Sequence, residues 1–341
     1  MPANLSPEYK AAEAAYRQAR DPRERLECLR EMLRTIPKHK GTEHLQADIK
    51  ARIKDLGEEL EGGAHKAGAR GGPSLVVRPE GAAQVALIGP PNAGKSSLHA
   101  RLTGSHAAVA DYPFTTQHPE PGMMPHEDIA FQLVDLPAVS PDHAVPWLAA
   151  TLQGADAAIL VLDLADPECL ERVRAIAEIL ARKRVTLAAR WPGDARAPAT
   201  QPVDDDPFAL RLPTLLAANK CDRLADPEGE LRAFLDLSGP GFPAMAVSAL
   251  TGRGLGELGP WLFAHLGIVR VYTKAPGHAP DKSRPYALRR GRTVADVARL
   301  IHRDLEHSLR YARLWGKSGH DGQQVGPEHA VADGDVVELH A

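Results

Sequence analysis

Residues 89–96, Gly-Pro-Pro-Asn-Ala-Gly-Lys-Ser, match the G-x-x-x-x-G-K-[ST] pattern of a phosphate-binding loop. An apolar run at residues 85–88 precedes the loop and a helix-like segment follows it, which is the setting that this pattern requires. The two glycines let the backbone curl so that its amides face phosphate oxygens at a helix N-terminus. Lys95 would neutralise β- and γ-phosphate charge, and the Ser96 hydroxyl would bind Mg²⁺. The residues expected at the nucleotide are Gly89, Pro90, Pro91, Asn92, Ala93, Gly94, Lys95, Ser96 and Ser97.

Three further motifs follow strand-like runs later in the chain. Asp135 ends the run Ile-Ala-Phe-Gln-Leu-Val and would hold Mg²⁺. Asp222 closes the motif Asn-Lys-Cys-Asp, and a carboxylate there can accept two hydrogen bonds from the N1 and N2 edge of guanine. Adenine cannot supply these donors, so the motif argues against a P-loop kinase or ATPase. The residues of the later motifs expected around the base are Asn219, Lys220, Asp222, Ser248, Ala249 and Leu250.

The motifs lie in a segment where apolar strand-like runs alternate with helical patterns. The runs begin at residue 84 and continue to residue 249, which predicts βαβ units and a mostly parallel sheet. We expect this α/β domain to cover residues 83–269. Residues 191–213 are rich in Pro and Asp, and we expect them to form a surface insertion without firm structure.

Different patterns occur on either side of this segment. Residues 1–60 carry apolar stripes at helical spacing on both sides of a Pro-Lys-His-Lys-Gly break, which predicts a helical hairpin. A Gly-rich stretch within residues 61–82 is typical of a linker. Residues 270–341 combine strand patterns with a helix that opens on a Thr-Val-Ala-Asp capping box, which indicates a small α+β module.

With these motifs the chain resembles the translation-factor-like GTPases, and among them the Obg and DRG (developmentally regulated GTP-binding) proteins. Residues 111–116, Asp-Tyr-Pro-Phe-Thr-Thr, resemble the first switch of that group, which implies that Thr116 reaches Mg²⁺ and the γ-phosphate, with Thr115 as the alternative. Residues 270–341 resemble the TGS domain, a ubiquitin-like β-grasp module. The resemblance implies a P-loop GTPase with Lys95, Thr116 and Asp135 as catalytic residues and with Ser96, Thr116 and Asp135 around Mg²⁺. It also implies a K⁺ ion held with the help of Asn92.

Two departures from the family pattern leave two functions open. Ala138 replaces the glycine of the D-x-x-G motif, and alanine makes a peptide flip to positive φ harder. The second switch, residues 139–147, has two prolines in place of a Gly-rich basic segment. One hypothesis is a slow, Mg²⁺-dependent GTPase associated with translation or the ribosome. The alternative is a nucleotide-binding scaffold with little turnover that acts through its helical and TGS ends.

Composition limits the partners and the compartment. No apolar run is long enough to span a membrane, and the N-terminus lacks a signal-peptide core. Three cysteines, far apart and odd in number, fit a reducing cytoplasm. Net charge is −3, with an acidic centre between mildly basic ends, so we expect any ribosome or rRNA contact at the ends. The candidate contacts are Lys38, Lys40, Arg289, Arg290 and Arg292. The other expected partner is GTP or GDP, and we expect the chain to be a monomer.

Overall fold

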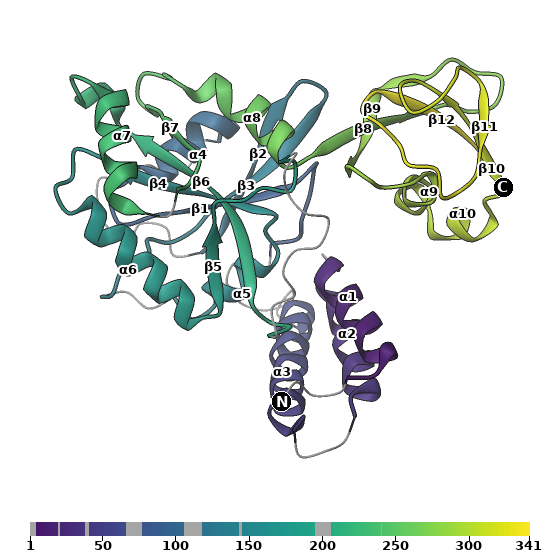
Figure 1. The fold of residues 1–341 in the computed structure, drawn as a ribbon, viewed down its shortest axis with the longest axis horizontal. Helices are drawn as coiled ribbons and strands as arrows, with labels where there is room; N and C mark the ends of the chain where they lie inside the picture. Colours follow the sequence, from purple (N-terminus) through teal and green to yellow (C-terminus); the bar gives the residue numbers. More distant parts are fainter. Residues whose placement is uncertain are drawn as a thin grey trace.

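The computed structural model describes residues 5–19, 21–37, 41–65, 77–105, 118–142, 145–194, 206–239 and 241–341. Figure 1 shows three parts: a central sheet flanked by helices, a column of N-terminal helices, and a smaller C-terminal sheet joined through β8. The fold class predicted from the sequence is confirmed, with a mostly parallel α/β sheet followed by a second mixed sheet. Within the described ranges, no helix is both long and apolar enough to cross a membrane.

The central sheet, as far as the structure describes it, has seven strands in the order β2-β3-β1-β4-β6-β5, with β7 beside β6. Its pairings are parallel except that of β2 with β3. The carboxyl ends of β1, β3, β4 and β6 therefore meet at one edge, where ligands bind in folds of this kind. The strands are β1 (Gln84–Ile88), β2 (Glu120–His126), β3 (Ile129–Asp135), β4 (Ala157–Asp163), β5 (Val185–Ala188), β6 (Leu210–Asn219) and β7 (Ala244–Ala246).

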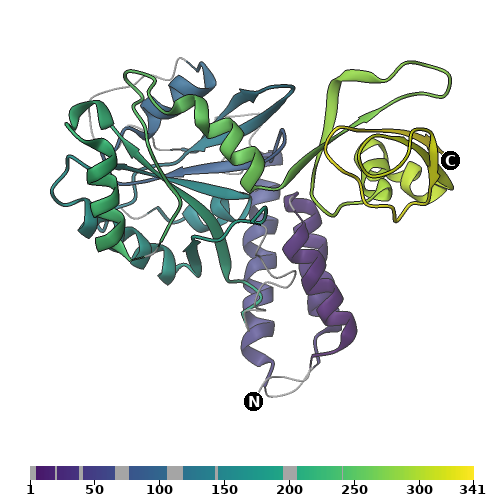
Figure 2. The same ribbon diagram turned by 45° about the horizontal axis from the view of Figure 1, so that its top comes forward.

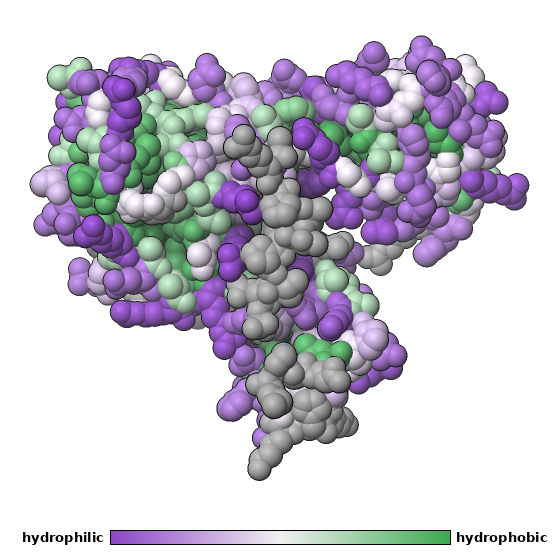
Figure 3. All heavy atoms as spheres, in the orientation of Figure 1, coloured by the Kyte–Doolittle hydropathy of each residue, from purple (hydrophilic) through white to green (hydrophobic). Residues whose placement is uncertain are grey.

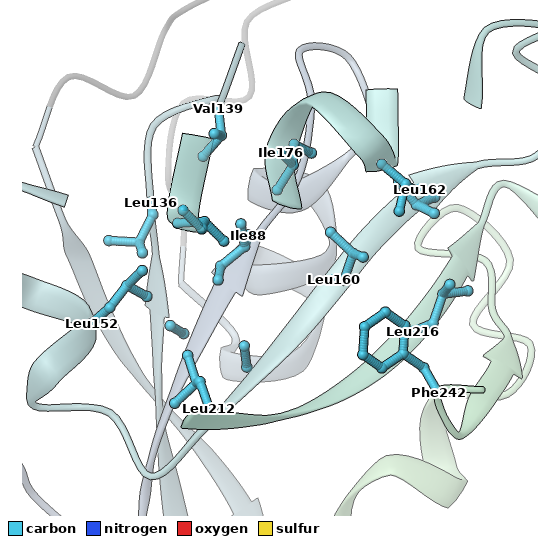
Figure 4. Close-up of a cluster of buried hydrophobic side chains, with 14 of the residues drawn as sticks. Ile88, Leu136, Val139, Leu152, Leu160, Leu162, Ile176, Leu212, Leu216 and Phe242 are labelled. Atoms are coloured by element: carbon cyan, nitrogen blue, oxygen red, sulfur yellow. The ribbon is translucent and has the colours of Figure 1, made fainter. Parts of the chain in front are cut away.

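Two apolar layers fix the sheet between its helices. Along β1, Ala86 and Ile88 join one core while Val85 and Leu87 join the other, as the alternation of side chains along a strand requires. Figure 4 shows the first core, in which Ile88 lies near Leu136 and Val139. Helices α5 (Leu148–Gln153), α6 (Cys169–Arg182) and α7 (Pro227–Ser238) cover that face, and α4 (Lys95–Thr103) and α8 (Leu258–His265) cover the other.

The N-terminal part contains α1 (Pro7–Gln18), α2 (Pro22–Thr35) and α3 (Glu43–His65). The predicted hairpin corresponds to α2 and α3, and α1 packs on α2 as an additional helix. Ser6 and Asp21 cap α1 and α2, and a proline follows each cap. Helix α3 continues to His65, past the boundary expected at residue 60, because extending an existing helix costs little. Residues 66–76 of the expected linker and Lys38 and Lys40 lie outside the described residues.

Residues 191–213 were expected to form a surface insertion without firm structure, and for the described parts of this segment that expectation is wrong. Trp191 is buried and packs edge-on against Trp261, with ring centroids 4.6 Å apart. Phe208 is buried against Tyr16 of α1, with centroids 5.9 Å apart, and β6 begins at Leu210. The described parts of this segment therefore join two cores, since their few aromatic and apolar residues outweigh the Pro- and Asp-rich composition. Residues 195–205 lie outside the described part.

The second sheet has the order β11-β10-β12-β8-β9. Its strands are β8 (Ile268–Thr273), β9 (Asp281–Arg289), β10 (Tyr311–Trp315), β11 (Gln323–Val325) and β12 (Asp335–His340). Helices α9 (Val294–Ile301) and α10 (Arg303–Ser308) pack beside it, and α9 opens on the predicted capping box of Thr293 and Asp296. On the face shown in Figure 3, hydrophilic residues make up most of the surface of this part.

A charged junction ties the second sheet to the first, beside the connection drawn in Figure 2. Arg270 of β8 donates to Asp333 at 3.0 Å. It also donates to Asp128 at 3.0 Å and to Glu127, which form the turn between β2 and β3. The Tyr272 hydroxyl also donates to Asp128. Hydrogen bonds to Asp333 and the other carboxylates raise the pKa of Arg270, although burial acts in the opposite direction. The guanidinium therefore stays charged and holds the two sheets together.

Candidate nucleotide site

The phosphate-binding loop connects β1 to α4 in the way the motif predicts. Gly94 precedes the first helical residue with φ of +86°, a left-handed conformation that favours glycine. A Cβ at this position would overlap the Asn219 side chain, and a Cβ at Gly89 would overlap the carbonyl oxygen of Val161. Close packing thus requires glycine at both positions, and backbone conformation requires it at Gly94 as well.

Lys95 lies in the first turn of α4, where the residue is 7% exposed. Its ammonium donates to the carbonyl oxygen of Pro90 at 3.1 Å, so the chain folds back over its own loop. Burial lowers the pKa of Lys95 to about 8, and the charge of Asp135 partly opposes this shift. A buried cation inside a loop of backbone amides is well placed to neutralise phosphate oxygens.

Ser96 and Asp135 meet across the sheet edge. The Ser96 hydroxyl donates to the Asp135 carboxylate at 2.6 Å, and Asp135, at the end of β3, is fully buried. Parallel pairing of β1 with β3 aligns Asp135 with Leu87, which brings the carboxylate next to the loop. A hydroxyl and a carboxylate oxygen are the hard donors that Mg²⁺ prefers, so this pair fits a Mg²⁺ ion that also contacts substrate phosphates. Among the described residues, no cluster of three or more His, Cys, Asp or Glu suggests another metal site.

Asn219, at the end of β6, links the loop to the base-recognition segments. Its amide nitrogen donates to the carbonyl oxygen of Ala93 at 2.9 Å, and its oxygen accepts from the backbone nitrogen of Ala249 at 3.0 Å. The next residue, Lys220, donates to the carbonyl oxygen of Asn92 at 2.6 Å. Two adjacent side chains thus hold the outer part of the loop in place.

Asp222 lies in a 3₁₀ turn, Cys221–Arg223, directly after this brace. The buried Ser248 hydroxyl donates to one oxygen of its carboxylate and accepts from the backbone nitrogen of Thr251 at 3.1 Å. This chain of hydrogen bonds sets the plane of an exposed carboxylate, which can then accept from a pair of donors on a planar base. Leu250, two residues after Ser248, is 81% exposed.

The structure therefore brings together the loop, Asp135, the Asn219 motif and the Ser248 segment, while Thr115 and Thr116 lie outside the described residues. Asp163, at the end of β4, was not among the residues predicted from the sequence. Its carboxylate pairs with Lys220 at 3.0 Å and with Arg223 at 3.3 Å. An aspartate that directly follows an apolar strand is the same signal that identified Asp135, so the residue could have been found.

The segment after Asp135 is anchored rather than open. Ala138 and Val139 are buried, and the backbone nitrogen of Val139 donates to the carbonyl oxygen of Gly89 at 3.1 Å. Val139 also packs in the core shown in Figure 4. The start of the second switch is thus joined to the first residue of the phosphate loop.

Two of the arginines expected at RNA in the C-terminal part have partners within the chain. Arg289 pairs with Asp156 of the central domain at 2.9 Å and donates to the carbonyl oxygen of Leu266. Arg292 pairs with Asp296 of the adjoining helix at 3.5 Å. Both guanidinium groups therefore have an acidic partner within the chain, one far away in the sequence and one four residues on. Arg290 remains exposed.

Comparisons with known proteins agree with this geometry. The profile of a family described as 50S ribosome-binding GTPase matches residues 84–190, and that of the TGS domain matches residues 269–341. An uncharacterized GTP-binding protein of Halobacterium salinarum is 30% identical to this chain, over an alignment that covers 93% of this chain and 98% of that protein. A developmentally-regulated GTP-binding protein 2 homolog of Dictyostelium discoideum is 28% identical, covering 91% of this chain and 96% of its own. Ribosome-interacting GTPase 1 of Saccharomyces cerevisiae is 26% identical, covering 93% and 98%.

Proposed function

The chain belongs to the DRG/Obg-type family of ribosome-binding GTPases with a C-terminal TGS domain, and on this premise we propose that it hydrolyses GTP slowly and with Mg²⁺. The observation that carries the proposal is the Asn219 side chain, which joins the phosphate loop to the base-recognition segments at 2.9 and 3.0 Å. It creates one site with a phosphate end and a base end, separated by protein that fixes their spacing.

Each group in the proposed site has a separate task. The loop amides and Lys95 bind the phosphates, and Asp222 accepts from N1 and N2 of guanine. Ser96, Asp135 and Thr116 would hold Mg²⁺, which supplies charge that stabilises the transferring phosphoryl group. Catalysis of phosphoryl transfer depends on positioning and charge rather than on covalent chemistry by the protein, and Lys95 supplies part of that charge.

A scaffold with little turnover is the second candidate, and one contact favours it. The N–H of Val139 is committed to the carbonyl oxygen of Gly89, and Ala138 beside it is buried. A rearrangement of the second switch toward the γ-phosphate would have to break that hydrogen bond. The two candidates differ in phosphate release from bound GTP, which single-turnover hydrolysis measures.

We propose further that K⁺ assists at Asn92, whose backbone is in the left-handed region with φ of +61°. Asn92 lies at the tip of the loop and is exposed, so its side chain can reach a cation beside the phosphates. Such a cation would act as arginine fingers do in other GTPases. Faster hydrolysis in KCl than in NaCl, with the difference reduced in Asn92→Ala, supports this role, and equal rates in both salts contradict it.

For the partner we propose ribosomal RNA, reached by exposed cations of the C-terminal part, in the cytoplasm. Arg284, Arg290 and Arg313 are exposed and can contact phosphates without breaking a contact within the chain that the structure describes. Each phosphate contact releases condensed counterions, so association should weaken steeply as salt rises. Co-sedimentation with ribosomes at low salt tests this. Arg290→Glu with Arg313→Glu should reduce it, whereas Arg30→Glu on α2 should not.

A further inference from the structure

A cavity of about 410 Å³ lies where the N-terminal helices meet the central domain. One wall comes from α2 and α3, and the other from α5 and the turn before β5, elements that lie side by side in Figure 1. A salt bridge of 2.9 Å between Asp48 of α3 and Arg184 closes the junction on one side. The cavity shares no lining residue with the nucleotide site.

Two arginines on the helical wall lack counterions. The Arg25 and Arg52 guanidinium groups make no ion pair or hydrogen bond with any part of the chain that the structure describes. The Arg25 guanidinium lies 5.2 Å from the ring centre of Tyr16, and that of Arg52 lies 4.2 Å from the ring centre of Phe208. The Nε atom of Arg25 is sealed from solvent and has no acceptor. By contrast, Arg184 on the opposite wall is paired with both Asp48 and Asp206.

Burial of an unpaired guanidinium is costly. It lowers the pKa of Arg25, and the positive charge of Arg52 lowers it further, while Tyr16 acts in the opposite direction. Stacking on an aromatic ring returns about 0.5–2 kcal/mol, less than the several kcal/mol that desolvation of an ion costs. An oxyanion that enters the cavity would satisfy the planar donors of both side chains.

The cavity is larger than an inorganic anion needs, and much of its wall is apolar. A volume of about 410 Å³ is within the range of small-molecule sites. Leu29, Leu56 and Trp147 contribute apolar surface beside the arginines, and Lys183 adds a further cation. Asp55 also lines the cavity, so the ligand needs only a small negative charge.

We propose that this cavity binds a small organic anion, with a phosphate or carboxylate group on Arg25 and Arg52 and an aromatic body against Leu29, Leu56 and Trp147. The ligand would contact α2, α3 and the start of α5 together. Because Pro146 and Trp147 end the second-switch segment, occupancy would fix the N-terminal helices against that segment.

The test is calorimetric titration of the full-length chain, saturated with GDP and Mg²⁺ so that the phosphate loop is already filled. The probes are phenyl phosphate and benzoate, which distinguish a phosphate from a carboxylate group. Inorganic phosphate and phenol, which carry the anionic group and the aromatic ring separately, are the controls. We expect one of the two aromatic anions to bind at least about tenfold more tightly than either control, since the arginines and the apolar wall each contribute.

Variants locate the site. Arg25→Gln and Arg52→Gln should each weaken the binding about tenfold or more, while Arg30→Gln, an exposed arginine on the same helix, should leave it unchanged. Removing a charge that has no counterion should not lower the thermal unfolding midpoint in the absence of the probe. In wild-type protein labelled with ¹⁵N-tryptophan, the Trp147 indole signal should shift and that of Trp315 should not.

Three results would overturn the proposal. They are absence of binding by both aromatic anions, equal binding by Arg25→Gln, Arg52→Gln and wild type, and a titration that leaves the Trp147 signal unmoved. None of these depends on GTP hydrolysis, so a failure here is separate from a failure of the proposed function.

Discussion

The side-chain nitrogen of Asn219 lies 2.9 Å from the carbonyl oxygen of Ala93, so the base-recognition strand and the phosphate loop share a hydrogen bond. The other end of the same amide accepts from Ala249 at 3.0 Å. One buried side chain therefore sets the distance between the two ends of the site, which is why an asparagine is needed there and not only a polar residue.

Asn219→Ala should weaken GDP and GTP binding alike, because the brace contacts protein rather than the γ-phosphate. Loss of two buried hydrogen bonds, at about 1 kcal/mol each, predicts a decrease in affinity of roughly thirtyfold. Fluorescence titration with labelled GDP and a GTP analogue measures both values. A loss confined to the GTP analogue would show that Asn219 acts in some other way.

Asp222→Asn should change base preference. The amide replaces one acceptor with a donor. Its NH₂ group opposes the N2 amino group of guanine but suits the C2 carbonyl of xanthine, while its oxygen still accepts from N1–H of either base. We expect GDP affinity to fall by about a hundredfold and XDP affinity to rise above it. Asp236→Asn, an exposed position on α7, is the matched control and should bind GDP normally. Retained preference for GDP in the Asp222 variant would contradict the assignment.

Lys95 predicts a pH dependence of nucleotide affinity. Burial lowers its pKa to about 8, and phosphates placed beside the ammonium raise the pKa in the complex. The contribution of the charge is therefore complete below that pH and declines above it, by up to about tenfold per pH unit. Calorimetry of GDP binding at pH 7 and pH 9 should show the loss together with proton uptake. Guanosine, which lacks phosphates, should show neither; an equal effect on guanosine would implicate the base instead.

The junction between the two sheets predicts coupling between Arg270 and Asp128. Burial opposes ionisation of Asp128, but the hydrogen bonds from Tyr272 and Arg270 prevail and lower its pKa. Its stabilising effect is then present above the ordinary carboxyl pKa of about 4 and is lost as the pH falls below it. A double-mutant cycle of Arg270→Gln and Asp128→Asn, by urea unfolding at pH 7, should give a coupling of about 1–3 kcal/mol. The coupling energy should be smaller at pH 3. A control cycle that pairs Arg270→Gln with Asp321→Asn, an exposed aspartate, should show no coupling.

The sequence predicted what local patterns determine. The phosphate loop is a contiguous motif between a strand and a helix, so its presence and position can be predicted from residues 84–103. The Asn219–Ala93 hydrogen bond joins residues 126 positions apart, and no local pattern contains that pairing. The pairing of Arg289 with Asp156 was not predicted for the same reason, since Asp156 belongs to a distant turn.

Two features of the fold were not predicted because the amino-acid composition of their segments pointed elsewhere. Residues 206–208 follow an Asp-rich stretch, yet the single aromatic ring of Phe208 is buried against α1 and decides the local structure. Helix α1 has fewer large apolar residues than α2 and was not separated from it, although Tyr9 and Tyr16 place one face of it in the core. Burial of one or two aromatic residues outweighs several polar neighbours, since each buries far more area than a small side chain.

Single-turnover hydrolysis tests the central claim most directly. The full-length chain, in excess over radiolabelled GTP and with Mg²⁺ and KCl, should release phosphate slowly but well above the rate in buffer. Ser96→Ala should remove most of this release, because it takes away the hydroxyl that lies 2.6 Å from Asp135. Addition of ribosomes should not abolish it. If bound GTP stays intact at the buffer rate in wild type, the chain is a nucleotide-binding scaffold and the proposed hydrolysis is wrong.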